Sequence, residues 1–328
     1  MFLKTNSDFS EQNDRCPVLV EIVPPEQGYE EKRLEEHTEY LTSMFQEVTV
    51  DAINIPEIQD ESKKGDKGKR ISPFKKRVTP RDYARALSGR FNTDFIINRV
   101  IVKEKPEVQE RWLLDTYNEY GIKNVVFVGG ESPEIKYPGP SVPDGSKMVK
   151  QFLNQGKLRY NKGDISPMEI SVGNICIPNR LEEELSEADR MFFKYNAGAD
   201  FFTTQIISEA DIPMALMKDF SEKLEKQGGN PPSIFWSFSP ISSQKDIDFL
   251  RWLGVYIPDA QEKQIMESDD PAAASLQIIE SAWEQMLDYN RQLPVPLPMG
   301  INVSVMGKRN YEHGIQMAKN LNSVSLPD

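Results

Sequence analysis

A carboxylate, Glu21, stands inside a short apolar stretch at residues 20–23 that ends at Pro24 and Pro25. Glutamate is rarely buried without a partner, and burial raises the pKa of a carboxyl group. A carboxyl that keeps its proton near neutral pH can act as a general acid. Glu21 is therefore a candidate proton donor, and the alternative is a glutamate exposed at a strand edge.

A second candidate, Gln205, ends a run that begins with a helix stop. The run at residues 201–207 is apolar apart from two threonines and Gln205, and Gly198 just before it can take the left-handed conformation that ends a helix. Buried strands of parallel sheets read as such near-continuous apolar runs, and functional groups gather at their carboxyl ends. Gln205 is expected at such an end, within reach of the same cavity as Glu21.

Two glycines and a carboxylate, Gly129, Gly130 and Glu131, follow the apolar run at residues 124–128. Glycines in this place allow a flat ligand to approach the backbone, but a glycine pair is equally consistent with a simple turn. The chain has no dinucleotide-binding glycine fingerprint, no P-loop and no nucleophile elbow. A dinucleotide-binding Rossmann domain, an NTPase and a serine hydrolase are therefore disfavoured.

The histidines and cysteines do not predict a metal site. His37 and His313 have no second ligand at metal spacing, so both are interpreted as surface or packing residues. Cys16 and Cys176 are the only cysteines, too few for a disulfide framework or a cysteine-based zinc site. Cys176 is interpreted as a small buried apolar residue.

The composition is that of a soluble globular protein of 328 residues, with 38% hydrophobic and 27% charged residues. No apolar run approaches the roughly 20 residues of a membrane span, and no signal-peptide pattern begins the chain. The net charge of -12 argues against nucleic-acid binding, because such proteins need a basic face. We expect a cytoplasmic protein that binds neither nucleic acid nor membrane.

Apolar stretches alternate with amphipathic stretches along nearly the whole chain, which predicts a parallel sheet with helical crossovers. Eight such stretches suit a single-domain (β/α)₈ TIM barrel over residues 18–328, preceded by an arm at residues 1–17. The expected strands are 18–23, 48–55, 94–102, 124–128, 169–175, 199–207, 233–238 and 300–305. The expected helices are 30–45, 107–120, 146–154, 182–194, 212–227, 244–253, 272–290 and 311–321.

One basic segment, residues 62–81, interrupts this otherwise acidic chain. It is expected to form a loop after the second strand, at the face of the barrel where ligands bind. It is either a solvated run of charge or an electrostatic clamp for an anionic ligand tail or an acidic partner.

In order and spacing, these motifs resemble the methylenetetrahydrofolate reductase family. They are Glu21 with its two prolines, the turn from Gly130 to Pro133, and the segment from Ala197 to Gln205, with Asn54 on the second strand and Gly173 on the fifth. The resemblance extends from about residue 18 to about residue 321 and implies a (β/α)₈ barrel. It also implies a flavin, FAD or FMN, that carries hydride from NAD(P)H to methylenetetrahydrofolate.

The resemblance implies a role for each matched position. Glu21 is similar to the family's general acid, and Glu131 stands where the family has an aspartate that contacts the pterin and tunes the flavin. Gln205 and Asn54 would contact the substrate. Six positions would contact the flavin: Asn98, Gly129, Gly130, Gly173, Arg190 and Lys194. Of these, Lys194 and Arg190 would bind its phosphate.

Three departures concern the flavin: Asn98 replaces a histidine common in the family, Gly129 replaces an arginine or threonine, and residues 175–177 replace a more polar run after the fifth strand. Two hypotheses about the function therefore remain open, in addition to a third in which the protein is a purely regulatory barrel. The first is a reductase that converts a methylene group on tetrahydrofolate or a related pterin to methyl. The second is a flavin-free pterin-binding protein or a subunit of a methyl-transfer complex. In both we expect an oligomer or a complex subunit, and no metal.

Overall fold

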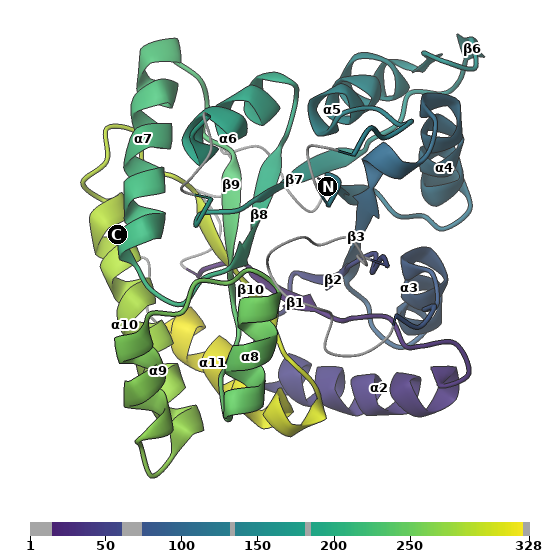
Figure 1. Ribbon diagram of the computed structural model, residues 1–328. Coiled ribbons are helices and arrows are strands. Elements are labelled where there is room, and N and C mark those ends of the chain that lie inside the picture. Colours follow the sequence, from purple (N-terminus) through teal and green to yellow (C-terminus); the bar gives the residue numbers. More distant parts are fainter. Residues whose placement is uncertain (1–14, 61–73, 132–134, 181–184, 324–328) are drawn as a thin grey trace.

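The strands of the computed structural model, which describes residues 15–60, 74–131, 135–180 and 185–323, close into a barrel surrounded by helices (Figure 1). All eight run parallel, in the order β1-β10-β9-β8-β7-β4-β3-β2. They are β1 (Val18–Glu21), β2 (Ala52–Ile55), β3 (Asp94–Val100), β4 (Asn124–Val128), β7 (Ser171–Cys176), β8 (Phe201–Ile206), β9 (Ser233–Phe238) and β10 (Met299–Ser304). The predicted (β/α)₈ barrel is confirmed, and every expected strand overlaps an observed one.

The helices cover the outside of the barrel (Figure 1). They are α2 (Glu30–Glu47), α3 (Pro80–Ser88), α4 (Pro106–Asn118), α5 (Val142–Gln151), α6 (Glu187–Asn196), α7 (Asp211–Gln227), α8 (Gln244–Trp252), α9 (Asp259–Met266), α10 (Pro271–Asn290) and α11 (Tyr311–Ser323), with short 3₁₀ turns η1 (Ile101–Lys103), η2 (Leu153–Gln155) and η3 (Lys308–Asn310). The sequence analysis missed α3, α9 and the two-residue strands β5 (Lys157–Leu158) and β6 (Gly163–Asp164). No described helix has the length and apolar content to cross a bilayer.

Several helices begin where the sequence places a capping side chain. Thr79, Ser141, Ser186 and Asp270 each accept a hydrogen bond from the backbone N–H three residues later. Such a cap satisfies a donor that the helix itself cannot. At the other end of α6, Gly198 has a φ of 105°, which confirms the predicted glycine stop before β8.

The lower interior of the barrel is one apolar layer to which each strand contributes one residue. Leu19, Ala52, Ile96, Val126, Phe201 and Phe235 form a buried cluster from six strands. The other two strands contribute glycines, because a Cβ on Gly173 would lie 2.4 Å from Phe201 and one on Gly300 would lie 2.6 Å from Phe235. The two rings pack edge to face with centroids 6.0 Å apart.

A polar layer lies above this apolar one. Since side chains alternate along a strand, the residues two positions further on point to the same side. They include Glu21, Asn54, Asn98, Ser237 and Asn302, one from each of five strands. The barrel interior therefore changes from apolar to polar toward the carboxyl ends of its strands, where barrel enzymes have their active sites.

Candidate functional site

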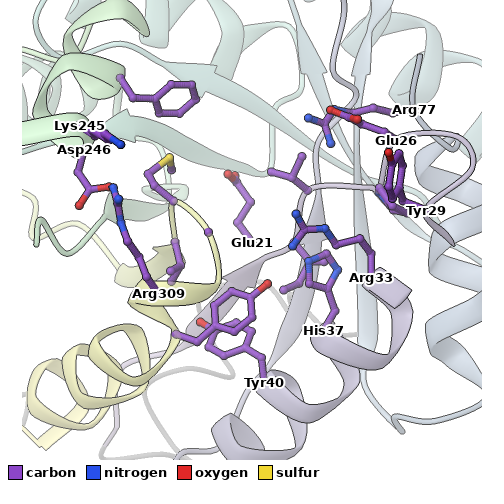
Figure 2. Close-up of a pocket in the computed structure, with 18 of the residues that line it drawn as sticks. Glu21, Glu26, Tyr29, Arg33, His37, Tyr40, Arg77, Lys245, Asp246 and Arg309 are labelled. Atoms are coloured by element: carbon purple, nitrogen blue, oxygen red, sulfur yellow. The ribbon is translucent and has the colours of Figure 1, made fainter. Parts of the chain in front are cut away.

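A cavity of about 770 Å³ opens beside the carboxyl ends of β1 and β10 (Figure 2). Its walls come from the β1–α2 connection, α2, α8 and the β10–α11 connection. The walls are largely apolar, with Ile22, Val23, Pro25, Phe249, Val305 and Met306 among the lining residues. This volume is within the range of pockets that bind small molecules.

Glu21 lies at the inner end of this cavity, between the Lys245 side and the Glu26 side (Figure 2). Its carboxyl group is held by two neighbouring strands. Ser304 Oγ donates to Oε1 at 2.9 Å, and Asn54 Nδ2 donates to Oε2 at 3.2 Å. Ser304 and Asn54 are the direct cross-strand neighbours of Glu21 in β10 and β2. The acid is therefore fixed in place and partly exposed to the cavity.

Burial raises the pKa of Glu21, and hydrogen bonds from Ser304 and Asn302 offset part of this rise. The physical cause is the loss of water around the charged form, which favours the protonated carboxyl. A carboxyl in this state can donate its proton to a basic nitrogen in the cavity.

A group of aromatic side chains and one histidine, from α2 and the start of α11, also lines the cavity. We call it the cavity floor. Tyr40 and Tyr311 stack with ring centroids 4.2 Å apart, and His37 Nδ1 lies 2.7 Å from Tyr83 Oη. Burial, and secondly Arg33, lower the pKa of His37 to about 4. His37 is thus a buried, neutral packing histidine, one of the two interpretations made from the sequence, and it also lines the cavity.

Gln205 does not line this cavity, although it lies near the end of β8 as expected. Its Nε2 donates to the Leu253 carbonyl at 3.2 Å, and its Oε1 accepts from the Ile206 N–H at 2.9 Å. The register of β8 against β9 shifts between Thr203 and Ile206. Such an irregularity changes the direction of the side chains that follow it. The expected common cavity of Glu21 and Gln205 is therefore not found.

The glycine pair after β4 makes room for a protein side chain. A Cβ on Gly130 would lie 2.1 Å from the ring of Tyr137, whereas one on Gly129 would meet only Val142, at 3.9 Å. Tyr137 Oη accepts from the Glu131 N–H at 2.9 Å, and Glu131 Oε1 forms an ion pair with Lys103 Nζ at 3.1 Å. Tyr137 covers the backbone of Gly130, where the sequence suggested a flat ligand.

The two cations expected at a flavin phosphate surround a buried carboxylate instead. Lys194 Nζ donates to the Ile175 carbonyl at 2.7 Å and lies 3.6 Å from Glu187 Oε1. Arg190 Nε lies 4.0 Å from Glu187 Oε2. Burial lowers the pKa of Lys194, and Glu187 partly opposes this. Lys194 ties α6 to the end of β7.

The remaining expected positions lie inside the barrel. Asn98 belongs to the polar layer and is buried, Asn54 holds Glu21, and Gly173 lies beneath the Phe201 ring. With Tyr137 over Gly130 and Lys194 bound to Ile175, the described residues do not fit a flavin at the positions that the resemblance implied. No group of three histidine, cysteine or carboxylate side chains able to hold a metal occurs in the described part of the chain.

Sequence reasoning missed Ser304 and the pair of Asp246 and Arg309, which join α8 to η3 in the cavity wall. A usable signal existed for both. Asn302 and Ser304 alternate with apolar residues along β10, and a serine at position 243 precedes Asp246 by three residues, as at a helix start.

Of the basic segment, residues 61–73 lie outside the described residues. The part that follows packs on the β1–α2 connection: the Gln27 N–H donates to the Lys76 carbonyl at 2.9 Å, and Lys75 pairs with Glu26 at 3.0 Å. Arg77 lines the cavity and donates to the Pro24 carbonyl at 2.7 Å. The end of the segment thus contributes Arg77 to the lining of the cavity, near the ligand-binding face as expected.

Comparisons with known proteins agree with this barrel. The family model for methylenetetrahydrofolate reductase matches residues 96–293, more than half of the chain. Among solved structures, an uncharacterized protein from Clostridium thermocellum that binds two copies of 5-methyl-5,6,7,8-tetrahydrofolic acid has a TM-score of 0.72, with 20% identity over 94% of this chain and 96% of that one. At this identity the likeness establishes the fold.

Two further solved structures are less similar. Tryptophan synthase from M. tuberculosis has a TM-score of 0.48, with 10% identity over 98% of this chain and 97% of that one. Dihydropteroate synthase from Xanthomonas albilineans has a TM-score of 0.44, with 11% identity over 95% and 94%. A search of curated protein sequences found no match.

Proposed function

Because the chain belongs to the methylenetetrahydrofolate reductase family, we propose that its cavity binds a folate-type tetrahydropterin that carries a one-carbon group. In this proposal Glu21 protonates the nitrogen that bears this group. The single observation that carries the proposal is the Glu21 carboxyl, held between β10 and β2 at the inner end of a cavity with largely apolar walls. The structural neighbour that binds 5-methyl-5,6,7,8-tetrahydrofolic acid supports the ligand class.

The cavity suits a flat ring with one basic edge. Val23, Pro25, Phe249, Val305 and Met306 are among the lining residues and offer apolar surface on which a ring can pack. Glu21 lies between the Lys245 side and the Glu26 side of the cavity (Figure 2). A pterin in this place would bring a ring nitrogen to the carboxyl and keep most of the ring out of water.

The proton transfer follows from elementary chemistry. The Glu21 O–H bond breaks as the nitrogen takes the proton, and the protonated nitrogen releases its carbon substituent more readily. The carboxylate left behind is stabilised by the hydrogen bonds from Ser304 and Asn54. This step serves the opening of a methylene bridge, in which the electron pair of the broken C–N bond returns to the protonated nitrogen. It equally serves the transfer of a methyl group from that nitrogen to an acceptor nucleophile.

The second candidate function is the family's reduction of the methylene group to methyl, in which a bound flavin would supply the hydride. The raised pKa of Glu21 favours it, because that reaction also begins with protonation of a folate nitrogen. The poor fit of the flavin positions makes flavin-free binding the first candidate, either as a pterin-binding protein or as a subunit of a methyl-transfer complex.

Calorimetric titration with 5-methyltetrahydrofolate tests the first candidate. The wild type should bind, with an affinity that changes several-fold between about pH 5 and pH 8, and Glu21→Gln should lose most of this pH dependence. Glu26→Gln changes a carboxylate elsewhere in the same cavity wall and is the matched control. Absence of binding by the wild type at about millimolar ligand refutes the proposal. Tight binding of FAD or FMN in a parallel titration favours the second candidate.

A further inference from the structure

The Glu21 carboxyl is held by hydrogen bonds from the strand on each side of it. Ser304 Oγ of β10 donates to one carboxyl oxygen, and Asn54 Nδ2 of β2 donates to the other. A separate set of hydrogen bonds joins the next strands: Asn302 Nδ2 of β10 donates to Ser237 Oγ of β9 at 3.0 Å, and Ser237 Oγ donates to the Thr204 carbonyl of β8 at 2.7 Å.

We propose that Ser304 is a positioning residue that holds the Glu21 carboxyl at the inner end of the cavity, oriented for proton transfer. This inference rests on the proposed function, in which Glu21 is the proton donor. Ser304 is buried, with an exposed fraction of 2%. It does not line the cavity, so its effect on a ligand passes through Glu21.

The geometry favours a positioning role over simple packing. A carboxyl at the end of a four-residue strand can turn about its side-chain torsions unless a partner fixes it. The bond from Ser304 fixes Oε1 and the bond from Asn54 fixes Oε2, so the carboxyl plane is set from both neighbouring strands. Asn302, two residues before Ser304 in β10, donates to Ser237 of β9.

Other charges contribute little to the proton affinity of Glu21. The titratable and charged side chains that face the cavity from the surrounding elements are Glu26, Tyr29, Arg33, His37, Tyr40, Arg77, Lys245, Asp246, Asp248, Arg309 and Tyr311. Among these described groups, none forms an ion pair with Glu21. The pKa of Glu21 depends on burial and on the donors of β10, so removing one donor should have a measurable effect.

The direct test is an NMR titration of the Glu21 side-chain carboxyl in the protein without ligand, assigned by its loss in Glu21→Gln. Ser304→Ala removes a donor that favours the carboxylate, so the pKa of Glu21 should rise by about one pH unit. Ser239→Ala is the matched control, because Ser239 is buried without a hydrogen-bond partner and lies outside this cavity. An unchanged titration in Ser304→Ala overturns the inference.

A double-mutant cycle in the binding of 5-methyltetrahydrofolate gives the second readout. Ser304→Ala should shift the pH dependence of binding in the wild-type background and leave it unchanged in the Glu21→Gln background. Equal effects in both backgrounds mean that Ser304 acts through packing and overturn the inference. If the wild type binds no pterin, the proposed function fails, whereas the carboxyl titration still decides the positioning role.

Discussion

Replacing Asp246 by alanine should destabilise the protein by about 3 kcal/mol, because this buried carboxylate joins α8 to η3 in the cavity wall. Its exposed fraction is 1%. It accepts hydrogen bonds from the Ser242 N–H at 3.0 Å, the Ser242 and Ser243 hydroxyls at 3.1 and 3.2 Å, and Asn310 Nδ2 at 3.3 Å, and it pairs with Arg309. The change therefore leaves several donors without their acceptor.

The magnitude comes mainly from two of these donors. The direction of the Ser242 N–H is fixed by the backbone, and the Asn310 amide is fully buried, so each loses its acceptor at a cost of about 1–1.5 kcal/mol. Arg309 has a side-chain exposure of 46%, so its loss of a partner is screened and adds less than about 1 kcal/mol. The serine hydroxyls can reorient and add little.

Urea unfolding followed by circular dichroism measures the effect. Asp248→Ala is the matched control, because Asp248 lines the same cavity from the same helix but is exposed. Burial alone would raise the pKa of Asp246, but the hydrogen bonds from Arg309, Ser242 and Asn310 hold it below the usual 3.8. The difference in unfolding free energy between the wild type and Asp246→Asn should thus be complete above about pH 3.8 and shrink as the pH falls below this value. Equal unfolding free energies for Asp246→Ala and Asp248→Ala would refute the reasoning.

Two further predictions concern the barrel interior and the cavity floor. Gly173→Ala should destabilise the fold by about 2 kcal/mol, because its Cβ would lie 2.4 Å from Phe201, whereas Gly129→Ala meets no side chain closer than 3.9 Å; similar urea midpoints for the two variants would contradict this. The ring protons of His37 should titrate near pH 4 in an NMR experiment, because burial lowers its pKa to about 4. The contribution of His37 to stability should then be complete above about pH 6.5 and fall toward pH 4, and a titration midpoint near 6.5 would show that the ring is not buried as described.

The fold was predictable because the strands of a parallel barrel are buried on both faces. The run at residues 124–128 is apolar apart from Asn124, and the run at 201–207 is apolar apart from two threonines and Gln205. Recognising this pattern needs no knowledge of neighbouring strands. The two-residue strands β5 and β6 carry no such pattern, because two residues cannot show a period. Position and type of the long elements were thus encoded locally.

The direction of individual side chains was not encoded locally. Gln205 turns away from the cavity because β8 shifts register against β9, a pairing between distant segments. Gly130 is covered by Tyr137, seven residues later, only because the loop after β4 folds back. Ser304 reaches Glu21 across 283 residues of sequence. Such relations depend on the closed barrel, so a sequence pattern supplied candidates and the three-dimensional structure sorted them.

The packing of residues 74–78 against the β1–α2 connection couples two regions that the sequence keeps apart. The Val78 N–H donates to the Pro25 carbonyl at 3.0 Å, and Arg77 and Glu26 form an isolated antiparallel β-bridge. Binding of a ligand in the cavity and binding of a partner to residues 74–78 would therefore be thermodynamically coupled, because both depend on the position of this segment. Whatever factor the ligand applies to the affinity for the partner, the partner applies to the affinity for the ligand.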